Sequence, residues 1–160
     1  MKISLKFVLA ALFFSIVSFL LSRVIWPDLR IIDILMSRVL HSEAGALSSM
    51  QLPLFVLLSL LESITFGVGV AFAFFGWKNF KTLMPGNRKA AFWCFVSIIW
   101  LLVSWWPHDN MHVLNAPDNL AGLLKIEYAF HVTLMIAGLI LARNLGRLFR
   151  RAGDPGLEVK

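Results

Sequence analysis

Charged residues and cysteine are both scarce in this sequence of 160 residues. Only 15% of the residues are Asp, Glu, Lys or Arg, whereas 59% are hydrophobic. A chain with so few charges cannot fold as an ordinary water-soluble domain, because one small core cannot hide that much apolar surface. The single cysteine, Cys94, excludes an internal disulfide and argues against thiol redox chemistry. We interpret it as a small packing residue.

Four apolar segments predict four transmembrane helices, since a helix needs about 20 mostly apolar residues to cross the hydrocarbon layer. The expected helices span residues 5–26, 52–77, 90–106 and 120–142. We expect the third to stop at Pro107, because proline interrupts the helical hydrogen-bond ladder. The first lacks a small-x-small cleavage site, which favours a retained anchor over a signal peptide. The sequence therefore predicts an all-α integral membrane protein, with residues 1–151 forming a single four-helix transmembrane bundle.

The distribution of Lys and Arg predicts that both termini lie in the cytoplasm, since cytoplasmic loops keep an excess of positive charge. In this topology the inner side carries Lys2, Lys6, Lys78, Lys81, Arg88, Lys89, Arg143, Arg147, Arg150, Arg151 and Lys160. The outer side carries only Arg23, Arg30, Arg38 and Lys125. The net charge of +6 is therefore explained by topology and by anionic lipid, and no nucleic-acid module is indicated. We expect a multi-pass protein of the bacterial cytoplasmic membrane, the cell inner membrane.

Two segments outside the spans have patterns of their own. Apolar and polar residues alternate at helical spacing over residues 29–44, with Asp28 as a helix cap and Gly45 as a stop. This pattern predicts an amphipathic helix that lies on the outer membrane face between the first two spans. The polar residues 152–160 are expected to form a flexible cytoplasmic tail.

Ionisable residues occur inside two of the predicted spans, where burying a charge costs roughly 2.5 to 3.5 kcal/mol. A helical rise of about 1.5 Å per residue places Glu127 about 24 Å and His131 about 18 Å from Arg143. The same count from Lys78 places Glu62 at about 24 Å on another helix. Two carboxylates at one depth suggest one site. Glu127 and His131 are four residues apart and therefore share a helix face.

Two histidines follow the third apolar segment. His108 and His112 are four residues apart, so a local helical turn brings them together, and Asp109 lies between them. Counting from Lys89 places His108 at about 28 Å, one turn above Glu127. Imidazoles and carboxylates together are typical ligands of zinc, iron, manganese or copper. We therefore predict a transition-metal site whose ligands are His108, His112, Glu127, His131 and Glu62.

The individual residues can act in more than one way. Glu62 either completes the coordination sphere or serves as a proton-transfer base, and Asp109 orients a histidine. The alternative is that these charges are simply paired, Glu127 with Lys125 or with protonated His131, while a protonated Glu62 bonds a nearby hydroxyl group.

Three functional classes follow from the predicted site. The first is a metal-dependent membrane enzyme, or a metal-handling protein, whose site opens toward the outer face. The second is a haem-binding membrane protein with His131 and another histidine as axial ligands. The third is a non-catalytic accessory subunit of a larger membrane complex, or a homo-oligomer, packed in the lipid bilayer. The sequence leaves open the metal, the substrate, the reaction and whether the protein is an enzyme.

Overall fold

A computed structural model describes residues 4–25, 51–84, 87–115 and 119–153 of the chain. All regular secondary structure within these ranges is helical, which confirms the predicted all-α class. The expected amphipathic helix over residues 29–44 lies outside the described residues, as does the tail beyond residue 153.

Four helical segments are long and apolar enough to cross a membrane, as the sequence predicts. In chain order the elements are α1 (Leu5–Ile25), α3 (Gln51–Phe75), α4 (Trp77–Phe80), η2 (Lys81–Leu83), α5 (Arg88–Val103), α6 (Trp105–Leu114), α7 (Leu120–Glu127), η3 (Tyr128–Val132) and α8 (Thr133–Gly153). The fourth span therefore continues past the predicted end at residue 142, and residues 152 and 153 belong to α8 rather than to a tail.

The prediction that the third span stops at Pro107 was wrong. Ser104 separates α5 from α6, yet its N–H donates to the Trp100 carbonyl and its own carbonyl accepts from the His108 N–H. Pro107 is the third residue of α6, where a backbone N–H has no partner within the helix to lose. The chain after Pro107 is consequently helix and not loop.

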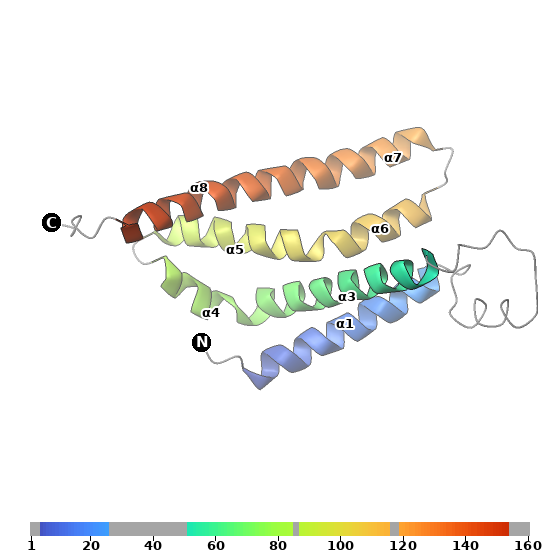
Figure 1. Cartoon of the computed structure of the whole chain (residues 1–160), viewed down its shortest axis with the longest axis horizontal. Coiled ribbons are helices and arrows are strands. Elements are labelled where there is room, and N and C mark those ends of the chain that lie inside the picture. The colour runs from blue at the N-terminus through green and yellow to red at the C-terminus, as the bar shows by residue number, and fades with distance from the viewer. Residues whose placement is uncertain (1–3, 26–50, 85–86, 116–118, 154–160) are drawn as a thin grey trace, which may run out of the picture.

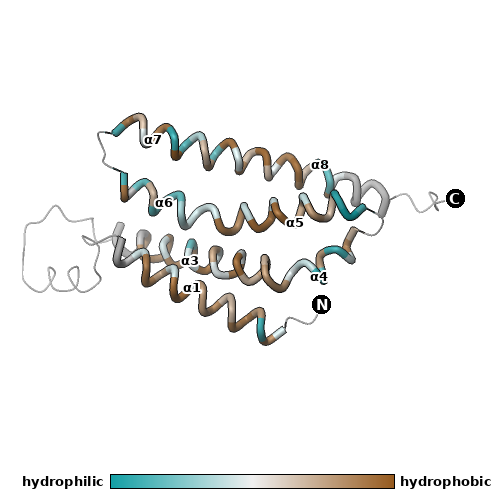
Figure 2. The backbone as a smooth tube through the Cα atoms, turned by 180° about the vertical axis from the view of Figure 1, so that it is seen from behind, coloured by the Kyte–Doolittle hydropathy of each residue, from teal (hydrophilic) through white to brown (hydrophobic). Residues whose placement is uncertain are grey.

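The spans lie side by side in the order of the chain (Figures 1 and 2). The most extensive helix contacts join α1 to α3, α5 to α8 and α3 to α5, while α6 also contacts α1 and α3. Figure 1 places the start of α1 and the end of α8 at the same end of the molecule, as four crossings require. The closed form of the bundle and the membrane side of the termini stay predictions.

The packing places small side chains inside and large apolar side chains outside. Buried residues include Ser18, Ser63, Ala71, Ala91 and Cys94. Exposed residues include Phe13, Phe74, Met135 and Leu139. An apolar surface of this extent is unfavourable in water but not in lipid, whose tails are as apolar as these side chains. Small residues between the helices let them approach closely, as is typical of membrane helices. The arrangement is that of helices solvated by lipid.

Candidate metal centre

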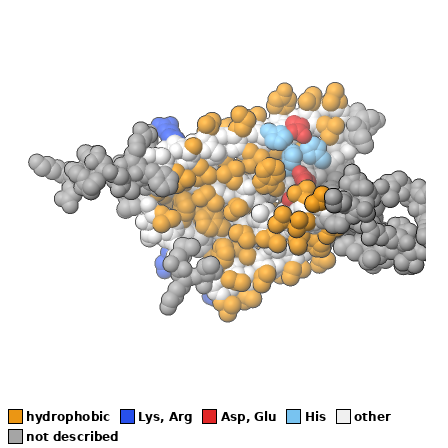
Figure 3. Space-filling model, viewed as in Figure 1, with side chains coloured by type: hydrophobic (Ala, Val, Ile, Leu, Met, Phe, Trp, Pro, Cys, Tyr) orange, Lys and Arg blue, Asp and Glu red, His pale blue; other side chains and the backbone are white. Residues whose placement is uncertain are grey.

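Histidine and acidic side chains gather toward the end of the molecule that lies away from the two termini. Figure 3 shows them together on a face whose other described side chains are largely apolar. They come from α6, from the end of α7 and from η3, which follows it. Three of them, His108, His112 and Glu127, can each offer one ligand atom, and these three atoms lie within 4.8 Å of one another.

Helix α6 places two imidazoles one turn apart. The Nε2 atoms of His108 and His112 are 3.1 Å from each other. On the far side of its ring, the Nδ1 atom of His108 lies 3.0 Å from Asp109 Oδ1. A carboxylate on Nδ1 fixes the tautomer and orientation of a histidine and leaves Nε2 available to a metal. The helical turn that the sequence predicted for this pair is therefore confirmed.

Contacts with α1 and α3 hold α6 in place. The indole N–H of Trp106 donates to Ser22 Oγ at 2.7 Å and to the Ser18 carbonyl at 3.1 Å. The same indole ring lies 4.9 Å, between ring centroids, from Phe66 of α3. Asn110 donates back to the Trp106 carbonyl at 2.6 Å. The histidine pair thus projects from a helix that is anchored on two other spans.

Helix α7 contributes Glu127 as its last residue, and both carboxylate oxygens are in use. Oε1 lies 3.1 Å from His112 Nε2. Oε2 lies 2.5 Å from His131 Nδ1, one turn further along the chain. The start of α7 is capped by Asn119, whose side chain accepts from the Gly122 N–H at 3.0 Å. Glu127 therefore joins the histidine pair of α6 to His131.

The spacing of the triad formed by His108, His112 and Glu127 fits a metal ion. Zinc bonds of 2.0 to 2.1 Å in tetrahedral geometry put neighbouring ligand atoms about 3.3 Å apart. Two of the three separations between the donor atoms, from His112 Nε2 to His108 Nε2 and to Glu127 Oε1, are 3.1 Å, and the third is within 4.8 Å. Two imidazoles with one carboxylate are the protein ligands of catalytic zinc sites and of non-haem iron sites, and three ligands leave a coordination position open.

No family model, curated protein or solved structure matches the chain. Its function is therefore inferred from the chemistry of this donor set and from its place among apolar helices.

The remaining predicted residues lie around the triad and outside it. His131 Nδ1 contacts the second oxygen of Glu127, and its ring also lies edge to face with that of His108, with centroids 5.2 Å apart. The carboxyl group of Glu62, on α3, lies beside that of Asp109. Exposure of the side chains rises along the series, from 11% for His108 and 29% for His112 to 41% for Glu127 and 52% for His131. The contacts thus extend from α3 to η3.

One element of the site could not be read from the sequence, a π-helical turn at Tyr128–Val132. The Thr133 hydroxyl follows it, donates to the Ala129 carbonyl at 2.5 Å and accepts from the Trp100 indole N–H at 3.0 Å. The Trp100 and Phe130 rings stack, with centroids 5.8 Å apart. Such turns are rare and recur at functional sites. Trp100 and Thr133 therefore hold this turn in place, and the sequence did not predict their role. The only sequence feature that could have suggested it is the threonine two positions after His131.

Thr133→Val is expected to weaken the fold through this turn. The variant leaves the Trp100 indole N–H without its partner, and we expect the free energy of unfolding to fall by about 1 to 2 kcal/mol. Unfolding by SDS in mixed micelles, followed by far-ultraviolet circular dichroism, measures this. The matched control is Thr65→Val, which removes only a local bond to the Glu62 carbonyl. Equal losses in the two variants would contradict the anchoring by Trp100.

Proposed function

We propose that the protein is a metal-dependent membrane enzyme whose metal ion is held by His108, His112 and Glu127. The observation that supports this most directly is the convergence of their three ligand atoms within 4.8 Å, on helices long and apolar enough to span a membrane. A metal ion bound there would act as a Lewis acid on a water molecule or a substrate oxygen at the open position. The residues of the chain hold the donor atoms in place and limit access by water.

Simple charge pairing explains less of the geometry. The pair of Glu127 and His131 is present, and it would by itself neutralise the carboxylate. Pairing gives no reason for a second imidazole on Glu127, or for His108 Nε2 to face His112 Nε2 at 3.1 Å. Both features are what a shared cation requires.

The neighbouring residues fit positions that support ligands. Asp109 accepts from His108 Nδ1, and His131 holds the oxygen of Glu127 that faces away from His112. Such contacts orient ligands and raise their basicity. Glu62, which lies beside Asp109, continues this support into α3. In our proposal Glu62 and His131 act through the ligands, in place of the direct coordination expected from the sequence.

The other two functional classes have less support. A haem needs two imidazoles that face each other across the macrocycle, whereas His112 and His131 contact the same carboxylate. An accessory subunit accounts for the apolar helices and leaves the triad without a purpose. Metal handling without catalysis would use the same residues, and turnover of a substrate would separate it from an enzyme.

Metal analysis of the purified chain tests the proposal. We expect close to one zinc or iron ion per chain after purification in mild detergent without added metal or chelator, measured by inductively coupled plasma mass spectrometry. His112→Ala should lower this content at least tenfold, because it removes one of three ligands.

The control is Lys125→Ala, which removes an exposed side chain two residues before Glu127. It should retain the metal content of the unmodified chain. An unmodified chain that binds neither Zn²⁺ nor Fe²⁺ after reconstitution, or a His112→Ala variant that keeps full occupancy, would contradict the metal centre. A Soret band in the visible spectrum would favour haem instead.

A further inference from the structure

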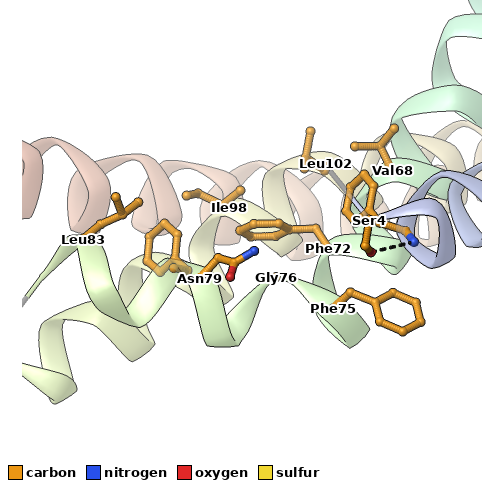
Figure 4. Close-up of a pocket in the computed structure, with 11 residues that line it drawn as sticks. Ser4, Val68, Phe72, Phe75, Gly76, Asn79, Leu83, Ile98 and Leu102 are labelled. Carbon is orange, nitrogen blue, oxygen red and sulfur yellow. Dashed lines mark hydrogen bonds between the residues drawn. The ribbon is translucent and has the colours of Figure 1, made fainter. Parts of the chain in front are cut away.

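A second feature lies near the opposite end of the molecule, where α1, α3, α4 and α5 enclose an apolar pocket of about 430 Å³ (Figure 4). Its lining is dominated by aromatic and branched side chains. The residues are Ser4, Phe7, Val68, Phe72, Phe75, Gly76, Asn79, Phe80, Leu83, Ile98 and Leu102. A concave apolar site of this size with a few polar groups is typical of a small-molecule binding site. The candidate metal ligands are not among these residues.

The pocket extends through about one leaflet of a bilayer. The lining residues of α3 and α4 run from Val68 to Phe80, which are twelve residues apart, or about 18 Å at the rise of a helix. The hydrocarbon layer is about 30 Å thick, so this length corresponds to roughly half of it. A pocket that starts at the membrane surface and ends near the midplane has the dimensions of a single lipid chain.

Two of the lining residues, Ser4 and Asn79, are polar. Asn79 is exposed at the pocket, beside the apolar side chains of the lining (Figure 4), and its amide has no hydrogen-bond partner among the described residues. Ser4 Oγ, at the start of α1, already accepts from the Phe7 N–H at 3.2 Å. An amide with a free donor and a free acceptor suits the ester region of a lipid.

Lysines are sequence neighbours of the polar lining residues. Lys6 lies between the lining residues Ser4 and Phe7, and Lys78 and Lys81 flank Asn79 and Phe80. All three lysines are exposed. Lysines close to a membrane surface each attract anionic lipid by about 1 kcal/mol. The charge therefore complements a phosphate head group rather than a neutral one.

We propose that this pocket binds one acyl chain of an anionic phospholipid, with its ester group at Asn79 and its phosphate near Lys78 and Lys81. In this proposal the apolar part of the pocket binds the acyl chain, the Asn79 amide bonds the ester group, and the lysines favour a negatively charged head group. The site is independent of the metal centre and does not require the proposed function.

Native mass spectrometry of the full chain in detergent tests this lipid site. The probe is an equal mixture of phosphatidylglycerol and phosphatidylcholine with identical acyl chains. We expect one tightly retained lipid per chain, with phosphatidylglycerol preferred. Val68→Trp should lower retention at least tenfold by filling the deep end of the pocket, and Ile98→Phe should do so from α5. Lys78→Gln with Lys81→Gln should lower the preference for phosphatidylglycerol about tenfold.

The control for pocket filling is Leu58→Trp, on an exposed position of α3 outside the pocket, which should retain lipid like the unmodified chain. Far-ultraviolet circular dichroism checks that each variant is folded. The proposal is overturned if folded Val68→Trp and Ile98→Phe both retain lipid normally, or if the unmodified chain retains none. Retention of a fatty acid or an isoprenoid in place of a phospholipid would also overturn it.

Discussion

Glu127→Ala is expected to lower the affinity of the chain for its metal ion at least about 100-fold. The change removes one of three ligand atoms, and a structural metal site of four ligands binds with about 10 to 16 kcal/mol, so a single ligand contributes several kcal/mol. It also removes the carboxylate that joins His112 to His131. Competition between the protein and a chelator of known affinity, with Zn²⁺ as the probe, measures the loss.

Comparison with a neighbouring variant separates a ligand from a residue that orients one. Asp109→Asn keeps the size of the side chain but replaces the carboxylate on His108 Nδ1, and we expect a smaller loss of about 10- to 100-fold. Lys125→Ala, an exposed position two residues before Glu127, should leave the affinity unchanged. If Glu127→Ala binds Zn²⁺ as tightly as the Lys125→Ala control, Glu127 is not a ligand.

Gly67→Ala is expected to be strongly destabilising, by about 3 kcal/mol. A Cβ atom at this position would meet Ser15 Oγ and the backbone carbonyl of Ala11, and would lie 2.5 Å from the Ser15 backbone nitrogen. Because two of these atoms belong to the backbone of α1, no rotamer change relieves the contact, and α1 must move away from α3. SDS unfolding in mixed micelles, followed by circular dichroism, measures the change.

Gly138→Ala is the matched control, because it makes the same substitution in another membrane-spanning helix. A Cβ atom at Gly138 meets nothing within 4 Å. The variant should therefore be neutral, or more stable by up to about 1 kcal/mol through helix propensity. Equal destabilisation by the two variants would show that the close contact of α1 with α3 does not control stability.

Much of the fold could be predicted because each apolar segment carries its own signal. Segment length alone predicted four helices able to cross a membrane, and four helical segments of that length and apolar character are present. The error at Pro107 arose because a proline is read as a stop, while the first turn of a new helix accepts it. Helix α5 ends and α6 begins on either side of a single residue, Ser104, and no sequence pattern predicts so short an interruption.

The candidate site was partly predictable for a different reason. Helical spacing relates residues on the same helix, and it correctly paired His108 with His112 and Glu127 with His131. The rise per residue gives the depth of a residue along its helix, and the similar depths of Glu62, His108 and Glu127 suggested that three helices share one site. Neither quantity fixes which face of one helix meets the next, so the position of His131 outside the triad could not be predicted. The π-turn depends on Trp100 of α5, a contact that local sequence does not record.

The inside-out packing of the helices affects how stability depends on the surrounding solvent. The buried residues are mainly small, many of them serines, and the large apolar side chains face outward. Separating the helices within a bilayer would therefore expose little surface whose contact with lipid is unfavourable. What resists separation is van der Waals contact at a few close crossings and a few hydrogen bonds. Chain length and lateral pressure of the host lipid therefore act directly on the free energy that holds the spans together, and a detergent micelle reports a different value from a membrane.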